Sequence, residues 1–390
     1  MADSHSLLRR RGEHDSGRVG MVELFFDLVF VFAVTQLSHA LLAHLDSATA
    51  LRVALLLVAI WWVWIYTSWC TNWLDPERLP VRICLFALMG AGLVLSVSIP
   101  EAFATRGLAF AAAYVAMQLG RTLFFLWAVR GESPAMVRNF QRIFIWLAIA
   151  AVFWVAGGLA EPGRRVPLWG IALAIEVISP AVYFWVPGLG RSSVSDWDID
   201  GSHMAERCGL FVIIALGESL LVTGATFAEA PWTAATIGGF VVAFIGTLAM
   251  WWVYFDSGAA RAHHRIVHST DPGRQGRIAY TYLHLPIVAG IIVGAVADEL
   301  VLAHPDHADA GAAAAILGGP ALYLVGTSLF KWVTNARRLP PFSHLVGLGC
   351  LLALVPLASG HAVSALALSA LATGALIVVA AWERVALRRA

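Results

Sequence analysis

Two carboxylates, Glu23 and Asp27, lie four residues apart in an apolar stretch, residues 22–44, that is long enough to cross a membrane. Residues four apart share a helix face, so the pair could bind a cation or carry a proton. An Asp at the centre of a spanning helix costs roughly 2.5–3.5 kcal/mol and normally faces protein or water. An acid at a helix N-terminus is instead favourable, which offers Glu23 a structural role. Further along the stretch, Gln36 and His39 could hydrogen-bond neighbouring helices, and His39 could titrate near neutral pH.

A second set of acids lies in residues 206–228, which open with Glu206 and carry Glu218 near their middle. Gly217 stands beside Glu218, so a neighbouring backbone could approach closely there. Ionisable groups inside spans are rare and commonly functional. We therefore predict that Glu218 is a proton or cation site.

Arg121 is the only basic residue that we place inside a predicted span, and a buried Arg must find an acid. Glu218, Asp27 and Glu176 are its candidate partners, and the sequence does not choose among them. A structural ion pair and an anion-binding Arg are equally consistent with the pattern.

Two other ionisable residues precede prolines: Glu176 comes four residues before Pro180, and His284 comes two residues before Pro286. Proline has no N–H, so it frees a backbone carbonyl in a helix. Carboxylates and freed carbonyls beside broken helices form cation sites in transporters. A helix kink stabilised by a buried polar side chain explains each pattern equally well.

Motifs of known enzymes are absent from the sequence. It contains no HExxH, GxSxG, Walker A or GxGxxG pattern, so we expect neither an enzyme nor a cofactor. The four cysteines form no CxxC pair, which favours core roles over metal or disulfide roles. No basic patch interleaved with aromatic residues indicates nucleic-acid binding. An intramembrane enzyme that acts on lipid without a known motif is the remaining enzymatic alternative.

The composition identifies the class of fold that must position these side chains. Hydrophobic residues make up 59% of the 390, charged residues only 13%, and the mean hydropathy is +0.75. Soluble domains have about 25% charged residues. We therefore predict an all-α polytopic membrane protein. Windows of about 20 residues give about twelve spans, namely residues 22–44, 50–70, 81–100, 107–129, 138–160, 167–187, 206–228, 233–255, 278–302, 311–333, 342–360 and 362–385.

The charges in the predicted loops give an orientation. If both termini, residues 1–20 and 386–390, are cytoplasmic, most of the 26 basic residues fall on the cytoplasmic side. The predicted outer loop 298–310 is instead acidic and contains histidines. We therefore expect a multi-pass protein that is surrounded by membrane lipid and has both termini in the cytoplasm.

Four pairs of markers recur in the same order in the two halves of the chain. They are Glu23 and Glu206, Trp61–Trp64 and Trp251–Tyr254, Arg82-Ile83 and Arg277-Ile278, and Thr122–Trp127 and Thr327–Trp332. A duplication would make residues 21–190 and 206–385 two repeats of six spans, joined by a linker at 191–205. Chance similarity among aromatic-rich helices is the alternative. Transporters built from such repeats place their substrate site between the halves.

Three segments, Glu23–His39, Glu206–Ser219 and Tyr280–Gly290, resemble the bacterial low temperature requirement protein A (LtrA) family. The first is the most specific, because an Asp followed by Thr-Gln-Leu-Ser-His is rare inside a span. The resemblance covers roughly residues 20–385, and Cys208 departs from the larger apolar residue expected there. It implies a bacterial inner-membrane protein that is linked by name to growth in the cold, and it brings no settled molecular activity.

Two functions from different classes fit these observations. The first is an ion- or proton-coupled secondary transporter or ion-conducting protein. In it, Asp27 and Glu218 carry a proton or cation, Arg121 and Glu176 complete a polar centre, and a small solute is a further possible partner. The second is a non-transporting membrane sensor or scaffold that supports growth in the cold, in which the buried charges only lock helices together. The sequence does not set the oligomeric state.

Overall fold

The computed structural model describes residues 6–9, 18–256, 260–267, 271–335, 339–359 and 363–387. Over this part of the chain the structure is helical, with two isolated β-bridges and no sheet. The predicted all-α polytopic membrane fold is confirmed. The outer residues of the two predicted tails, 1–5, 10–17 and 388–390, lie outside the described residues.

Eleven of the described helices are long and apolar enough to cross a membrane. They are built from α1 (Met21–Ala43), α2 (Ser47–Trp73), α3 (Leu79–Ser98), α4 (Gly107–Val129), α5 (Pro134–Leu159), α7 (Gly201–Glu229), α8 (Ala234–Tyr254), α10 (Pro272–Gln275) with a π-helical turn (Gly276–Tyr282) and α11 (His284–Ala303), α12 (Ala310–Asn335), α13 (Phe342–Ser359) and α14 (Ala365–Leu387).

The sixth predicted span, residues 167–187, differs from the structure. Its helix, α6 (Pro162–Ile178), has 17 residues and is about 26 Å long at about 1.5 Å per residue. It ends two residues before Pro180, which cannot donate a helical hydrogen bond. Tyr183 and Phe184 follow in the left-handed region, with φ of 54° and 48°, so the chain turns away where the prediction continued a helix.

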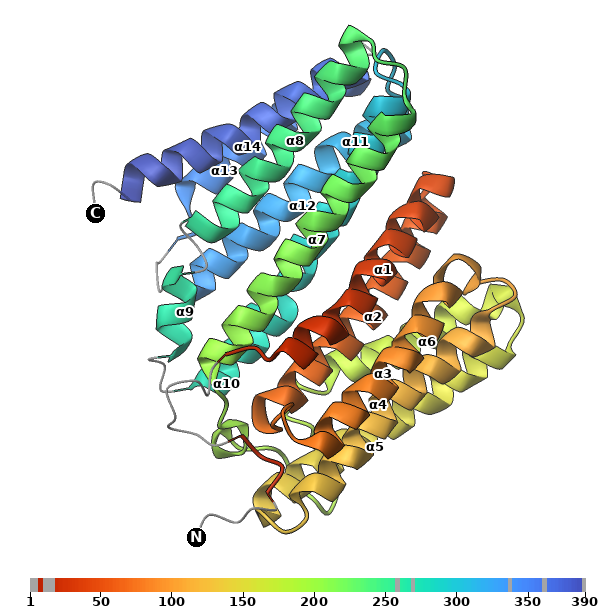
Figure 1. Cartoon of the computed structure of the whole chain (residues 1–390), viewed down its shortest axis with the longest axis vertical. Helices are drawn as coiled ribbons and strands as arrows, with labels where there is room; N and C mark the ends of the chain where they lie inside the picture. The colour runs from red at the N-terminus through yellow and green to blue at the C-terminus, as the bar shows by residue number, and fades with distance from the viewer. Residues whose placement is uncertain are drawn as a thin grey trace. The chain divides into compact units, whose positions relative to one another are not determined.

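The chain divides into two compact units, each described here by itself. The first comprises residues 1–40, 51–207 and 270–277, and the second comprises 41–50, 208–269 and 278–390. In the first unit, α3, α4, α5 and α6 pack in chain order (Figure 1). Its core is rich in fully buried aromatic residues, among them Trp61, Trp64, Trp154 and Trp169. The predicted six-plus-six duplication and its boundaries stay predictions.

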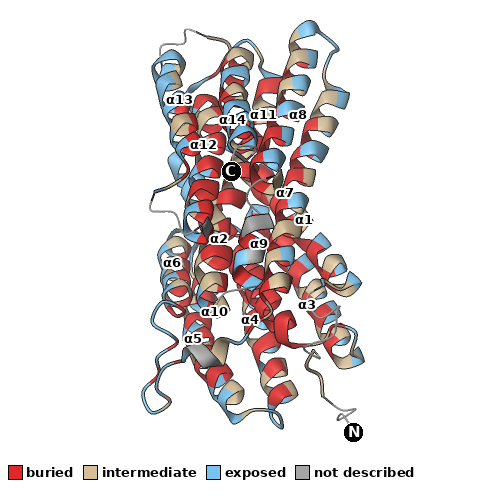
Figure 2. Cartoon of the chain, turned by 90° about the vertical axis from the view of Figure 1, so that its left-hand side faces the viewer, coloured by how far each residue is buried: buried red, intermediate tan, exposed pale blue. Residues whose placement is uncertain are grey.

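In the second unit, α11 packs most closely on α12, and α14 lies against α8 and α13 (Figure 1). Glycines permit the close approach of α11 and α12: a Cβ on Gly319 would lie 2.8 Å from the backbone N of Gly294. Small residues serve this purpose in membrane helices. Figure 2 shows α12 as largely buried and α13 as largely exposed, which suits α13 to a lipid-facing position.

Several charged residues that were assigned to predicted loops lie within helices, among them Arg207, Lys331 and Asp298. Arg207 is inside α7, which begins at Gly201 rather than at 206, and Lys331 is inside α12. Asp298, expected in an outer loop, lies in α11. Arg207 and Lys331 are 0% and 1% exposed, so the expectation that Arg121 is the only basic residue within a span is wrong. Arg207 lies one residue after the predicted start at 206 and Lys331 two residues before the predicted end at 333, so both were counted with the neighbouring loops.

Candidate functional site

The two carboxylates of α1 share a buried face, as their spacing predicts. Glu23 and Asp27 are both 0% exposed. Around them in the first unit lie Arg9 from the N-terminal segment and His203 and Arg207 from the first turns of α7. We call these five residues the α1 charge network.

Asp27 is held by a cation and an indole. Arg207 Nη1 donates to Asp27 Oδ2 at 2.8 Å, and Trp64 Nε1 donates to Oδ1 at 2.8 Å. The Arg207 guanidinium also donates to Ser68 Oγ at 3.2 Å and to the Glu23 carbonyl at 3.1 Å. Its carbon lies 5.4 Å from the Trp64 ring centre, within cation–π range. Both oxygens of the carboxylate are therefore occupied by protein donors.

Glu23 is held equally firmly at the start of α1. Arg9 Nη2 lies 2.7 Å from Oε2, the Gly20 N–H donates to the same oxygen at 2.9 Å, and His203 Nε2 lies 2.8 Å from Oε1. Asn72 Nδ2 lies 3.2 Å from the other ring nitrogen of His203. An amide N–H can only donate, so Nδ1 accepts and Nε2 carries the proton that reaches Glu23.

The α1 charge network is therefore balanced. Its two carboxylates face two arginines, and a neutral His203 satisfies the remaining contact. Such a network ties α1 and α2 to the first turns of α7 within the first unit. Each oxygen of the Asp27 carboxylate already has a protein donor, so the geometry favours locking of helices by this pair.

A second polar cluster surrounds Glu176 of α6, which is 1% exposed. Tyr114 OH donates to its Oε2 at 2.6 Å, Gln118 Nε2 donates to the same oxygen at 2.7 Å, and Trp154 Nε1 donates to Oε1 at 2.9 Å. Arg121 Nη2 donates to Gln118 Oε1 at 2.5 Å. Arg121 thus reaches Glu176 through the amide of Gln118, without a direct ion pair. Of its three candidate partners, Glu176 is the one in this cluster.

The carbonyl that Pro180 leaves without a helical donor belongs to Glu176 itself. Ser179 Oγ donates to that carbonyl at 2.8 Å. The Glu176 carbonyl oxygen, which a cation site would require, therefore already accepts a hydrogen bond from the Ser179 hydroxyl at the same helix end. This geometry matches the kink interpretation of the Glu176 and Pro180 pattern.

His284 is fully buried at the start of α11, where both ring nitrogens have partners. Nδ1 lies 2.9 Å from the Ala279 carbonyl, to which it must donate, and Nε2 then accepts from Tyr254 OH at 2.7 Å. Pro286 lies in the first turn of α11, where a missing N–H costs nothing. The imidazole joins α8 to α11 in the second unit.

Glu218 differs from every other acid predicted at the site. It is 4% exposed and lies within α7, yet no described residue hydrogen-bonds or ion-pairs with it. A Cβ on neighbouring Gly217 would meet nothing described within 4 Å, so the close backbone approach expected there is not seen. Glu206 is exposed and accepts from Val19 N at 3.2 Å.

The remaining predicted residues lie toward the C-terminal end of α1. Gln36 is half-buried and His39 is exposed, and neither has a hydrogen-bond partner among the described residues. The structure therefore brings Glu23 and Asp27 together, and separately Arg121 and Glu176. It leaves Gln36, His39 and Glu218 outside both clusters.

Sequence reasoning missed the partners of the α1 acids. A signal was available for α7: Asp200 Oδ1 accepts from Ser202 N at 2.8 Å and His203 N at 3.2 Å, which is N-cap geometry. An Asp immediately before the helix indicates a start at 201, which places His203 and Arg207 inside α7. Nothing local in the sequence indicates that Arg9 pairs with Glu23.

A second missed ion pair lies in the second unit. Lys331 Nζ of α12 lies 2.5 Å from Glu383 Oε2 of α14 and donates to the Val253 carbonyl at 2.7 Å. His344 of α13 lies 3.5 Å from the other oxygen of Glu383. This cluster joins the ends of α8, α12, α13 and α14. Among the described residues there is no group of three or more His, Cys, Asp or Glu side chains that could hold a metal ion.

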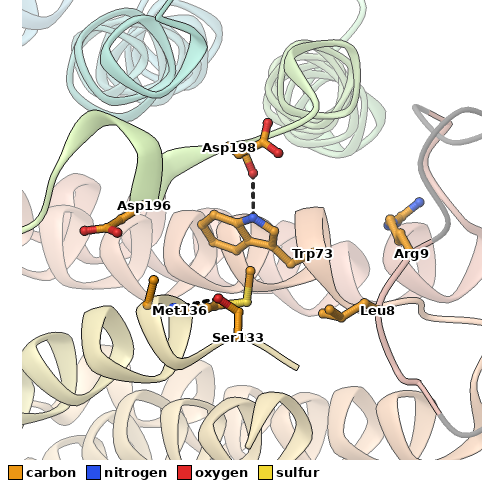
Figure 3. A pocket seen from close by; sticks show the side chains of 8 residues that line it. Leu8, Arg9, Trp73, Ser133, Met136, Asp196 and Asp198 are labelled. Carbon is orange, nitrogen blue, oxygen red and sulfur yellow. Dashed lines mark hydrogen bonds between the residues drawn. The ribbon is translucent and has the colours of Figure 1, made fainter. Parts of the chain in front are cut away.

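A cavity of about 290 Å³ opens in the first unit between the N-terminal segment, the end of α2 and the start of α5. Figure 3 shows Trp73 between Asp198 and Met136, with its indole N–H donating to the Asp198 carbonyl at 2.7 Å. Arg9 lines the same cavity. The volume is close to the lower end, about 300 Å³, of small-molecule pockets.

Comparison with known protein families identifies the family of this chain. The sequence model of the bacterial low temperature requirement A protein (LtrA) family matches residues 18–381. An uncharacterized protein from Rhizobium meliloti (strain 1021) is 45% identical over 394 residues, which cover 100% of this chain and 94% of the relative. No solved structure matches the chain. With nearly the whole chain matched, this multi-pass membrane protein belongs to the LtrA family.

Proposed function

We propose that the chain is an ion- or proton-coupled transporter or an ion-conducting protein in which Glu218 carries the ion. The observation that supports this proposal is a buried carboxylate, 4% exposed, with no hydrogen-bond or ion-pair partner among the described residues. It lies about 16 Å from the C-terminal end of the 29-residue helix α7, at about 1.5 Å per residue. That position is far from either end of the span.

An isolated, ionised carboxylate in an apolar span is expensive, at about 2.5–3.5 kcal/mol even on the insertion scales that give the lowest cost. We infer that the Glu218 carboxylate exchanges a proton or a cation, which is the elementary step of ion coupling. Asp27 and Glu23 are already neutralised by Arg207 and Arg9. Glu218 is therefore a better candidate for the carrier than the α1 pair.

The proposal includes the setting of the protein. We place it in the bacterial cytoplasmic membrane with both termini in the cytoplasm, in contact with lipid, and with a proton, a cation or a small solute as its cargo. It has no catalytic role and needs no cofactor. The family's name motivates a contribution to growth in the cold.

Reconstitution in liposomes tests the proposal. The purified protein should give a current or dye-reported flux under an imposed H⁺, Na⁺ or K⁺ gradient, and Glu218→Gln should abolish it. Glu229→Gln is the matched control, because Glu229 is an exposed acid at the end of the same helix. Equal flux in Glu218→Gln and wild type would refute the assignment of Glu218.

A non-transporting sensor or scaffold is the second candidate, and the saturated α1 charge network favours it. Both oxygens of Asp27 have donors, which is what a purely structural pair requires. On this alternative, folded protein shows no flux with any of the three ions. Neutralising the buried acids then changes only the stability of the protein in detergent.

A further inference from the structure

A small cavity in the second unit has polar groups set in an otherwise apolar wall. Its lining comes from five helices, α7, α8, α11, α12 and α14. Its volume is about 30 Å³, whereas one water molecule needs about 10–15 Å³ on this measure. Pockets for organic ligands measure about 300–1,000 Å³. The cavity therefore suits a guest the size of an ion or one to two waters, and excludes an organic solute.

The polar lining consists of oxygen atoms. Asp298 of α11 contributes a carboxylate, and Ser219, Thr247, Ser369 and Thr373 contribute hydroxyls. No described residue hydrogen-bonds or ion-pairs with Asp298, although it lies on a helix that is apolar enough to span a membrane. A carboxylate without a protein partner beside a polar cavity is neutralised either by a proton or by a cation in the cavity.

A proline interrupts the helical hydrogen bonding next to this wall. Pro320 lies inside α12 and has no N–H to donate to the carbonyl of Ile316, four residues earlier. Both residues line the cavity. Carbonyls released from helical bonding coordinate Na⁺ in transporters with interrupted helices. The residues that line the cavity thus include one with a carboxylate, four with hydroxyls and one whose carbonyl has no helical donor.

The geometry points to a binding site for one dehydrated monovalent cation of the size of Na⁺, with Asp298 as its charged ligand. Carboxylate, hydroxyl and carbonyl oxygens are the ligands of hard cations. No basic residue lines the cavity, so an ionised Asp298 would be the single charge of its lining. A monovalent cation neutralises that charge, whereas a divalent ion would leave an excess positive charge in apolar surroundings. Binding of the cation requires no transport. Only the role of the bound ion in ion coupling rests on the proposed function.

Thermal unfolding of the full-length protein in detergent tests the site. The unfolding temperature should rise saturably with Na⁺ when N-methyl-D-glucamine chloride keeps the ionic strength constant. Asp298→Asn should weaken the apparent Na⁺ affinity at least tenfold. Glu299→Gln, on the same helix but outside the cavity lining, is the matched control and should keep the wild-type response. A wild type without a saturable Na⁺ response, or an Asp298→Asn variant that retains it, would overturn the inference.

A second variant decides the question if Asp298→Asn does not fold. A Cβ on Gly246, which lines the cavity, would lie 3.3 Å from Thr373 Oγ1, so Gly246→Ala narrows the space and keeps the carboxylate. In Gly246→Ala, the Na⁺ concentration that gives half of the rise in unfolding temperature should increase at least tenfold. Gly349→Ala is its control, because a Cβ there meets nothing described within 4 Å. An unchanged Na⁺ response in Gly246→Ala would contradict the site.

The two proposals fail separately. Flux that Glu218→Gln abolishes, together with no Na⁺ response in the wild type, would overturn the cation site alone. A saturable Na⁺ response that depends on Asp298, together with no flux of any ion, would overturn the transport function alone.

Discussion

Replacing Asp27 with Asn leaves Arg207 charged in a place that water does not reach. Both side chains are 0% exposed, and 2.8 Å separates Arg207 Nη1 from Asp27 Oδ2. Removing one partner of a buried ion pair typically costs about 3–5 kcal/mol. Arg207 keeps its hydrogen bonds to Ser68 and to the Glu23 carbonyl, and Asn retains an oxygen for Trp64. We therefore expect the lower end, about 3 kcal/mol of lost stability.

The double variant supplies the internal control. Arg207→Met alone leaves the Asp27 carboxylate without its cation and held only by the Trp64 indole, so it should cost a similar amount. In Asp27→Asn with Arg207→Met no buried charge of the pair remains, and replacing both partners of such a pair is often close to neutral. The loss of unfolding free energy in the double variant should therefore be smaller than the sum of the two single-variant losses, by at least about 2 kcal/mol.

Unfolding by a denaturing detergent in mixed micelles, followed by tryptophan fluorescence and circular dichroism, measures these free energies. Single variants within about 0.5 kcal/mol of wild type would refute the idea that the buried pair locks α1 to α7, since that is the range of an ordinary surface substitution. Additive losses in the double variant would refute direct coupling between the two side chains.

Three further changes test other parts of the structure. Glu176→Gln should lower stability by about 1–3 kcal/mol, because an amide has one oxygen in place of the two that accept three donors; detergent unfolding measures it. Lys331→Met should destabilise by about 3–5 kcal/mol by leaving Glu383 without its cation, and adding Glu383→Leu should restore most of the loss in the same assay. Asp46, before α2, accepts from the Thr49 N–H, and this hydrogen bond holds the pKa of Asp46 below its usual value. Its stabilising effect is present above the pKa of the unfolded chain and lost as pH falls through the lower folded pKa. Asp46→Ala should therefore lower the unfolding temperature at neutral pH and lose this effect in acid, and an effect that persists in acid would contradict the capping role.

Most of the fold could be predicted because its signal is local. Runs of about 20 apolar residues placed α1 at 22–44 against the observed Met21–Ala43, and α4 at 107–129 against Gly107–Val129. The failures are local chemistry that a hydropathy average cannot detect. Pro180 ends α6 early, and Asp200 starts α7 early.

The candidate site was predictable only in part, because its contacts join residues far apart in the chain. Helical spacing put Glu23 and Asp27 on one face, but their partners in α7, His203 and Arg207, are each 180 residues away in sequence. The pairing of Arg121 could be narrowed to three acids, and the relay through Gln118 could not be foreseen. Asp298 was assigned to a loop because the acidic residues after it extended the apparent loop into the helix.

Flux through reconstituted protein under separate H⁺, Na⁺ and K⁺ gradients, in wild type and in the Glu218→Gln and Glu229→Gln variants, tests the central proposal most directly. The structure predicts ion-dependent flux in wild type and Glu229→Gln, and none in Glu218→Gln. Equal flux in all three, or none from folded wild-type protein with any of the ions, would contradict the assignment of Glu218 as the carrier.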